Sequence, residues 1–144
     1  MRTLNTDNTI RLLNKILEYE LAGVIKYTQF SLIVTGPYRS TIVQFLQEQA
    51  SESLTHAQSV GEILTGLDAV PAIGQLNFTQ RQLTLKEILE ESAEHEQQAL
   101  NLYKELLTEV EGASVYLEEF VRGQIGQEEL HHIELRKMLR DFSQ

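Results

Sequence analysis

The sequence contains no cysteine and no tryptophan, only two prolines among 144 residues, and 12 basic residues against 21 acidic ones. Without cysteine, the chain forms no disulfide bond, no thiolate zinc site and no cysteine nucleophile. The formal charge of −9 argues against nucleic acid as a partner, since no basic stripe is present to meet phosphates, and it suits attraction of cations. No apolar run approaches the roughly 18 residues that span a bilayer, and the N-terminus lacks a signal-peptide pattern. We therefore expect a cytoplasmic protein that does not enter a membrane.

Apolar residues make up 42% of the chain, and they recur at spacings of three and four residues. Such spacing is typical of amphipathic helices. Residues 67–83 show no clear helical pattern and form an unusually long connector, which in an all-helical protein indicates a crossover along the bundle. We predict a single all-α domain, 1–144, folded as a four-helix bundle with a long crossover between the second and third helices. The predicted helices cover approximately residues 6–34, 38–66, 85–111 and 114–142.

Several predicted helix ends carry recognisable capping residues. Asn5, Thr6 and Asp7 offer side chains that cap the first helix. Thr84 and Glu87 form the capping-box pattern at the start of the third helix, and Ser114 caps the fourth. These signals support the predicted boundaries.

Three chemically active side chains interrupt the apolar stripes near the middle of their helices. Glu20 is flanked on its face by leucine, valine and tyrosine, and Glu96 has similar neighbours on the third helix. His56 lies on the apolar face of the second helix. Burial of a carboxylate or an imidazole is costly unless another group neutralises or coordinates it. Each alone is compatible with an ordinary polar residue, which reaches water or has a hydrogen-bonded partner in the core.

The fourth helix supplies a further pair, Glu129 and His132, three residues apart on one helical face. Ile125 and Ile133 lie at helical spacing from Glu129, so we expect this face to be buried. Helix bundles that hold two metal ions use the Glu-x-x-His spacing, with single glutamates on partner helices. The joint occurrence of such residues on all four helices predicts a di-metal centre, and carboxylates mixed with imidazoles suit Fe, Mn or Zn.

These residues resemble the pattern of the bacterioferritins, a family of ferritin-like di-iron carboxylate proteins. The similarity runs almost without gaps from about residue 14 to residue 139, nearly the whole domain. The stretches that carry it are residues 13–17 with Glu20-Leu21 and Tyr27, residues 56–57 and 62–64, Val70-Pro71, and Glu129 with residues 132–134.

The resemblance implies a role for each matching residue. Glu20 and Glu96 correspond to terminal carboxylate ligands, and His56 and His132 to the imidazole ligands. Glu129 corresponds to a bridging carboxylate. Tyr27 corresponds to the tyrosine beside the centre, and we expect it to take part in catalysis.

Three features depart from the family pattern. Ser53 stands where a second bridging glutamate is expected, and we expect Glu52 to substitute as a metal ligand. Leu54 replaces the methionine that ligates haem, so haem is not expected. The fifth helix of the cage-forming members would follow Gln144, so we expect a homodimer or small homo-oligomer rather than a 24-subunit cage.

The resemblance implies binding of Fe(II) and its oxidation by O2 or peroxide, a ferroxidase-type activity in iron homeostasis or oxidative protection. Two alternatives remain. The same centre could oxidise an organic substrate, which requires an apolar pocket open to the metals. The bundle could instead keep a degenerate site and act as a structural or binding protein, for which Ser53 is the best support.

Overall fold

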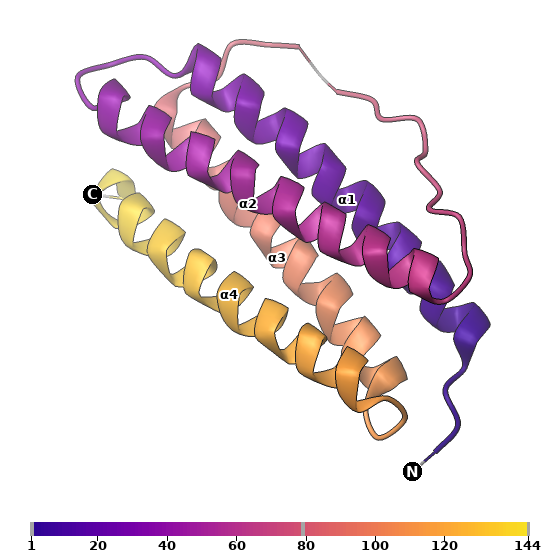
Figure 1. Ribbon diagram of the computed structural model, residues 1–144. Coiled ribbons are helices and arrows are strands. Elements are labelled where there is room, and N and C mark those ends of the chain that lie inside the picture. Colours follow the sequence, from indigo (N-terminus) through magenta and orange to yellow (C-terminus); the bar gives the residue numbers. More distant parts are fainter. Residues whose placement is uncertain (1, 79, 144) are drawn as a thin grey trace.

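The computed structural model describes residues 2–78 and 80–143, and within them the regular structure is entirely helical. Figure 1 shows the elements as a bundle of long helices. They are α1 (Thr6–Ile33), α2 (Arg39–Gly66), α3 (Leu85–Val110) and α4 (Val115–Leu139), followed by the short 3-10 helix η1 (Arg140–Ser143). The predicted four-helix architecture is confirmed. The fourth α-helix ends at Leu139, earlier than expected, because the chain tightens into η1.

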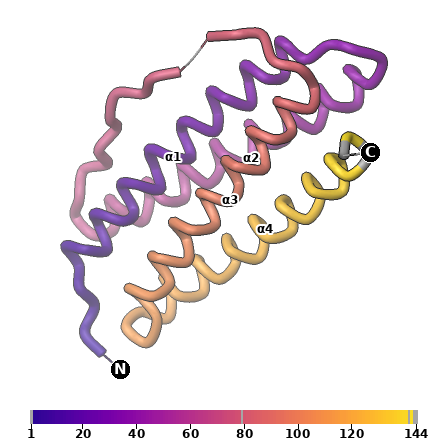
Figure 2. The backbone as a smooth tube through the Cα atoms, turned by 180° about the vertical axis from the view of Figure 1, so that it is seen from behind, coloured from indigo at the N-terminus to yellow at the C-terminus, as the bar shows by residue number. Residues whose placement is uncertain are grey.

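The long connector determines how the helices are paired. α1 and α2 run in opposite directions, and so do α3 and α4 (Figure 1). Residues 67–78 and 80–84 lie along the length of the bundle outside α1, which both Figure 1 and Figure 2 show, so α2 and α3 run parallel. The backbone N–H of Ala72 donates to Asn14 on α1 at 2.9 Å, which ties the crossover to the bundle. α1 packs mainly on α2 and α3 mainly on α4, with a smaller contact between α1 and α3.

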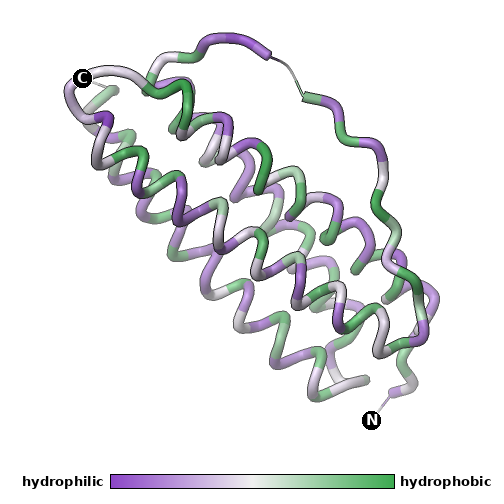
Figure 3. Tube along the Cα trace, turned by 45° about the horizontal axis from the view of Figure 1, so that its top comes forward, coloured by the Kyte–Doolittle hydropathy of each residue, from purple (hydrophilic) through white to green (hydrophobic). Residues whose placement is uncertain are grey.

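The hydrophobic core consists of two clusters with a polar layer between them. One cluster holds side chains from the start of α1, the end of α2 and the end of α3, including Leu13, Leu64 and Tyr103. The other holds the opposite ends of these helices, including Phe30 and Leu46. In Figure 3, apolar and polar residues alternate along each helix, as expected when one face of every helix is buried. The middle of each helix is therefore left for polar side chains.

The predicted capping signals are present at the helix ends. Thr84 and Glu87 form a reciprocal capping box, with bonds of 3.2 and 2.9 Å. Asn5 accepts from the N–H of Asn8, and Ser114 accepts from that of Leu117. Each cap satisfies an N–H group that has no partner within its helix. Among the described helices, none is both long enough and apolar enough to cross a membrane.

Candidate metal centre

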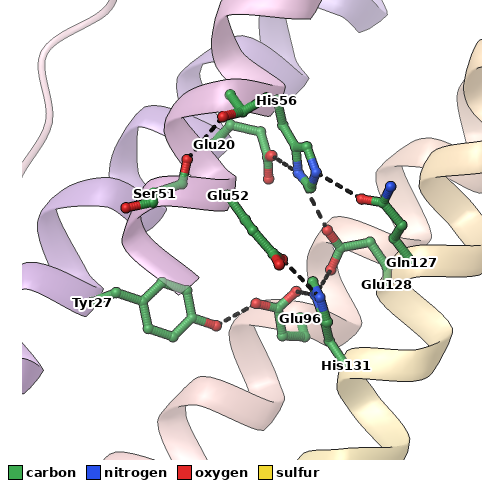
Figure 4. A network of polar contacts seen from close by, with 10 residues as sticks. Glu20, Tyr27, Ser51, Glu52, His56, Glu96, Gln127, Glu128 and His131 are labelled. Carbon is green, nitrogen blue, oxygen red and sulfur yellow. Dashed lines mark hydrogen bonds and ion pairs between the residues drawn. The ribbon is translucent and has the colours of Figure 1, made fainter. Parts of the chain in front are cut away.

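A buried polar layer crosses the bundle at mid-length. Glu20 of α1, His56 of α2 and Glu96 of α3 are almost completely buried, as their apolar stripes predicted. Glu128 of α4 joins them and is only 2% exposed. His131, one turn further along α4, lies beside it and is partly buried. These five side chains come from all four long helices, and Figure 4 shows them turned toward one another.

The prediction that α4 buries Glu129 is wrong by one residue. Glu129 is exposed, and His132 is only partly buried and belongs to neither donor group described below. The buried stripe of α4 is Leu117, Val121, Glu128 and Leu135. One residue turns a helix by about 100°, so this stripe directs Glu128 and His131 inward and leaves Glu129 on the outer side.

The Glu-x-x-His pattern occurs in two adjacent frames because both the glutamate and the histidine are doubled. Ile125 and Ile133, whose spacing favoured the Glu129 frame, lie at the edge of the core: Ile125 is partly buried and Ile133 is 41% exposed. Val121, Glu128 and Leu135 are spaced seven residues apart, and this spacing was the signal in the sequence for the correct frame.

The inward side chains form two groups that share one member. Donor atoms of Glu20, His56 and Glu128 lie within 4.8 Å of one another, and so do donor atoms of Glu96, Glu128 and His131. Each group supplies one terminal carboxylate, one imidazole and Glu128. We call them the His56 position and the His131 position. This geometry can hold two cations side by side with the Glu128 carboxylate between them.

Both imidazoles direct Nδ1 toward the carboxylates. Nδ1 of His56 lies 2.7 Å from Oε2 of Glu20 and 3.7 Å from Oε1 of Glu128. Nδ1 of His131 lies 3.9 Å from Oε2 of Glu128 and 4.0 Å from Oε2 of Glu96. The hydroxyl of Tyr27, predicted to lie beside the centre, is fully buried and donates to Oε1 of Glu96. Tyr27 thereby fixes the orientation of one terminal carboxylate.

The outer nitrogens of the two histidines have different partners. Nε2 of His56 contacts Oε1 of Gln127 at 3.0 Å. Nε2 of His131 contacts Oε2 of Glu52 at 2.7 Å. Glu52, which we expected to be a metal ligand, belongs to neither donor group, because its side chain reaches the far side of the imidazole (Figure 4). Gln127 was not among the residues predicted from the sequence to belong to the site.

Ser53 and His95 occupy the core on the α1 side of this layer. Both are buried, and neither belongs to either donor group. A Cβ atom on Gly23 would lie 3.0 Å from Oγ of Ser53 and 2.7 Å from Nε2 of His95, so only glycine fits between them. The His95 ring stacks on Tyr19 with centroids 4.3 Å apart, and burial lowers its pKa to about 4. His95 is therefore neutral at ordinary pH.

Burial dominates the electrostatics of the carboxylates. Desolvation, together with a hydrogen bond to Glu96 and nearby negative charge, raises the pKa of Glu128 to about 11. Desolvation also raises the pKa of Glu20, although its hydrogen bond to His56 acts in the opposite direction. For His56, burial lowers the pKa but the contact with Glu20 outweighs it, and the net shift is upward. In the absence of a cation, protons thus compensate the carboxylate charge.

The donor set fits a metal pair. Oε2 of Glu128 and Nδ1 of His131 are buried and have no hydrogen-bond partner, although they face each other. A cation bound about 2.0–2.2 Å from each donor would fill such a space and satisfy both atoms. Coordination would also keep the carboxylates ionised despite their burial. Oxygen and imidazole donors suit Fe, Mn or Zn.

Solved structures with the same fold include several iron-related proteins. A ferritin-like diiron-carboxylate protein from Bacillus anthracis is 23% identical, with a TM-score of 0.88, and the match covers 96% of this chain and 99% of that one. A dodecameric thioferritin from Bacteroides fragilis, a bacterioferritin-related protein, is 21% identical with a TM-score of 0.89 over 98% and 89% of the two chains. Rhodobacter capsulatus bacterioferritin is 20% identical with a TM-score of 0.84 over 95% and 86%.

Among curated proteins, none matches this sequence. The model of the ferritin family, described as the ferritin-like domain, matches residues 10–144. This match covers α1 from residue 10 onward, all of α2, α3 and α4, and every side chain of the two donor groups. The chain belongs to the ferritin family of ferritin-like domains.

Proposed function

We propose that this protein binds two metal ions in its polar layer, with iron as the native metal, and that it oxidises Fe(II) with O2 or peroxide. The observation that carries this proposal is the pair of donor groups that share Glu128. Two cations close together need negative charge between them, and a shared carboxylate supplies it. Such chemistry serves iron homeostasis or protection against oxidants.

Each side chain has a defined task in this centre. Glu20 and Glu96 would each hold one ion, Glu128 would be shared by both positions, and the two histidines would complete the positions through Nδ1. Bound iron would supply the redox chemistry, and the protein would supply the ligands that hold it. Tyr27 holds Glu96 in place, because its hydroxyl donates a hydrogen bond to that carboxylate.

A cavity of about 480 Å³ between α2 and α4 leads to the centre. It reaches His56 and His131 and is lined mainly by polar side chains, among them Thr55, Ser59 and Gln124. Such a lining suits a hydrated cation and small oxidants. Oxidation of an organic substrate calls for an apolar pocket at the metals, and this cavity does not favour that alternative.

Anaerobic titration of the metal-free protein with Fe(II), followed by exposure to O2, tests the proposal. We expect two Fe(II) per chain, a higher melting temperature with metal, and O2 consumption without an organic substrate. His131→Ala should lose most of the metal response, whereas the adjacent His132→Ala should keep it. A protein that binds no metal, as the structural-protein alternative requires, would overturn the proposal, as would equal effects of the two variants.

We further propose that the chain forms a homodimer or another small homo-oligomer. Ile25, Leu32 and Leu54 are exposed apolar residues on α1 and α2, and burial between subunits would remove them from water. Light scattering at ordinary protein concentration tests this expectation. A particle of 24 subunits would contradict it.

A further inference from the structure

We infer that the outer face of α4 is a docking surface for α4 of a second copy of this chain, packed antiparallel about a two-fold axis. Docking here does not depend on the proposed metal centre, and it uses a surface other than the exposed apolar residues of α1 and α2. In Figure 1 and Figure 2 the crossover runs outside α1, and α4 lies at the opposite edge of the bundle. Its outer face is therefore free to meet another molecule.

This outer face carries a heptad pattern that the core does not use. From Tyr116 to Arg140, the residues at alternating spacings of three and four are all exposed, and the buried stripe of α4 lies on the opposite side. Arg140 keeps helical backbone angles, with φ −55° and ψ −42°, so it continues the face beyond the last residue of α4. Residues at this spacing form the seam between two helices of a coiled coil.

The middle of the face combines exposed apolar residues with glycines. Leu130 is 56% exposed and Ile133 is 41% exposed. A Cβ atom added to Gly123 or Gly126 would meet nothing within 4 Å, so no contact within the described chain requires glycine at either position. Each glycine inside a helix costs about 1 kcal/mol relative to alanine. Glycines on an outer face let a second backbone approach closely.

The two ends of the face carry opposite charges. Glu119 lies near the start of α4, whereas Lys137 and Arg140 lie at its end, and all three are exposed. Lys137 contacts Glu134 only at 3.8 Å, so it can take another partner. An antiparallel pair brings each acidic end to a basic end, whereas a parallel pair would bring like charges together. The charges therefore favour the antiparallel arrangement.

One register of the antiparallel pair matches large side chains with glycines. With the two-fold axis midway between Gly126 and Leu130, Leu130 packs against Gly126 of the partner subunit. Ile133 then packs against Gly123 of the partner subunit. Because the interface is symmetric, each contact occurs twice. The glycines supply the space that the two apolar side chains fill.

The same register also matches the ends. Lys137 faces Glu119 of the partner subunit, and Arg140 faces Tyr116 of the partner subunit. Tyr116 is 70% exposed, and a hollow of about 440 Å³ bordered by Lys137, Leu139 and Arg140 can receive its ring. A guanidinium over a tyrosine ring is a favourable contact. A single register thus satisfies the charges, the glycines and the hollow together.

Sedimentation equilibrium at low salt, over a range of protein concentrations, measures the association. A single helix face is smaller than most permanent interfaces, so we expect a reversible complex with a Kd on the order of micromolar. Lys137→Glu places acidic residues opposite each other at both ends and should weaken association by about 10-fold. Adding Glu119→Lys should restore the native Kd. Lys104→Glu makes the same charge change at an exposed site on α3 and should have no effect.

A glycine variant separates docking from folding. Gly126→Gln fills the space that Leu130 of the partner subunit requires and should weaken association, while the stability of the single subunit is kept or raised. Gly61→Gln is the matched control on α2, because a Cβ atom there also meets nothing within 4 Å. It should leave association unchanged.

Cysteine cross-linking tests the register, because the native chain contains no cysteine. A mixture of the Glu119→Cys and Lys137→Cys proteins should form a disulfide-linked dimer on mild oxidation, whereas neither protein alone should. A cross-linked dimer of either variant alone, or none in the mixture, would overturn the inference. So would a native protein that stays monomeric, or equal effects of Lys137→Glu and Lys104→Glu. These measurements need no metal, so a failure to bind metal would refute the proposed function without touching this interface.

Discussion

Replacement of Glu128 by glutamine should stabilise the metal-free protein and abolish binding at both metal positions. Glu128 is buried among carboxylates, and its pKa of about 11 means that the folded protein keeps it protonated. In the unfolded chain the same group has its ordinary pKa of 4.5 and is ionised at neutral pH. Folding without metal therefore requires uptake of a proton at this position.

The sign and size of the effect follow from this difference in proton binding. Between pH 4.5 and pH 11 the folded state binds more protons than the unfolded state, so the free energy of unfolding falls as pH rises. The slope is at most about 1.4 kcal/mol per pH unit, which gives an upper bound of about 5 kcal/mol at pH 8. Glutamine has no such cost, and its amide still offers an N–H to Glu96. We expect Glu128→Gln to gain several kcal/mol at pH 8 and almost nothing at pH 4.5.

Denaturant unfolding of both metal-free proteins from pH 4.5 to pH 8 measures this gain. The lowered pKa of His95 makes stability rise with pH between about 4 and 6.5, but this contribution is common to both proteins and cancels in the difference. The exposed Glu129→Gln variant serves as a control and should show no gain. A pH-independent difference, or a loss of stability in Glu128→Gln at pH 8, would refute the assignment of a buried proton. Two bound Zn(II) ions in that variant would refute Glu128 as the shared ligand.

Three further substitutions test individual contacts by denaturant unfolding of the metal-free protein. Tyr27→Phe removes the hydrogen bond to Glu96 and should cost about 1 kcal/mol; an unchanged stability would contradict this contact. Gly23→Ala places a Cβ atom 2.7 Å from the His95 ring and should cost about 1–3 kcal/mol, much of it recovered when His95→Ala is added. Thr84→Ala removes the capping box of α3 and should cost about 1 kcal/mol, with metal binding unchanged.

The sequence contains enough information for the architecture and for most of the buried polar layer. Apolar spacing defined the helices, and the capping box at Thr84 marked the start of α3 to the residue. Glu20 and Glu96 could be placed in the core because each stands alone on an otherwise apolar stripe. These features are local, and spacing along one helix determines them.

The orientation of α4 and the contact of Glu52 depend on distances between helices. In α4 both frames of the doubled Glu and His pairs have apolar neighbours, and packing against α3 selects the frame of Glu128. Glu52 and His56 are four residues apart, a spacing that allows a shared ligand role. The structure shows instead that Glu52 reaches across to α4, where it contacts Nε2 of His131.

The crossover outside α1 divides the chain into two helical hairpins joined in series. Each hairpin forms from contacts between helices that are adjacent in the sequence. Docking of the two hairpins must close a long loop, so we expect it to be the slower folding step. An ion at the proposed His56 position would join the two hairpins, because its ligands would be Glu20 and His56 from one hairpin and Glu128 from the other. Cross-links made only after docking slow unfolding and leave the folding rate almost unchanged. The supply of metal should thus set the lifetime of the folded bundle more than the speed at which it forms.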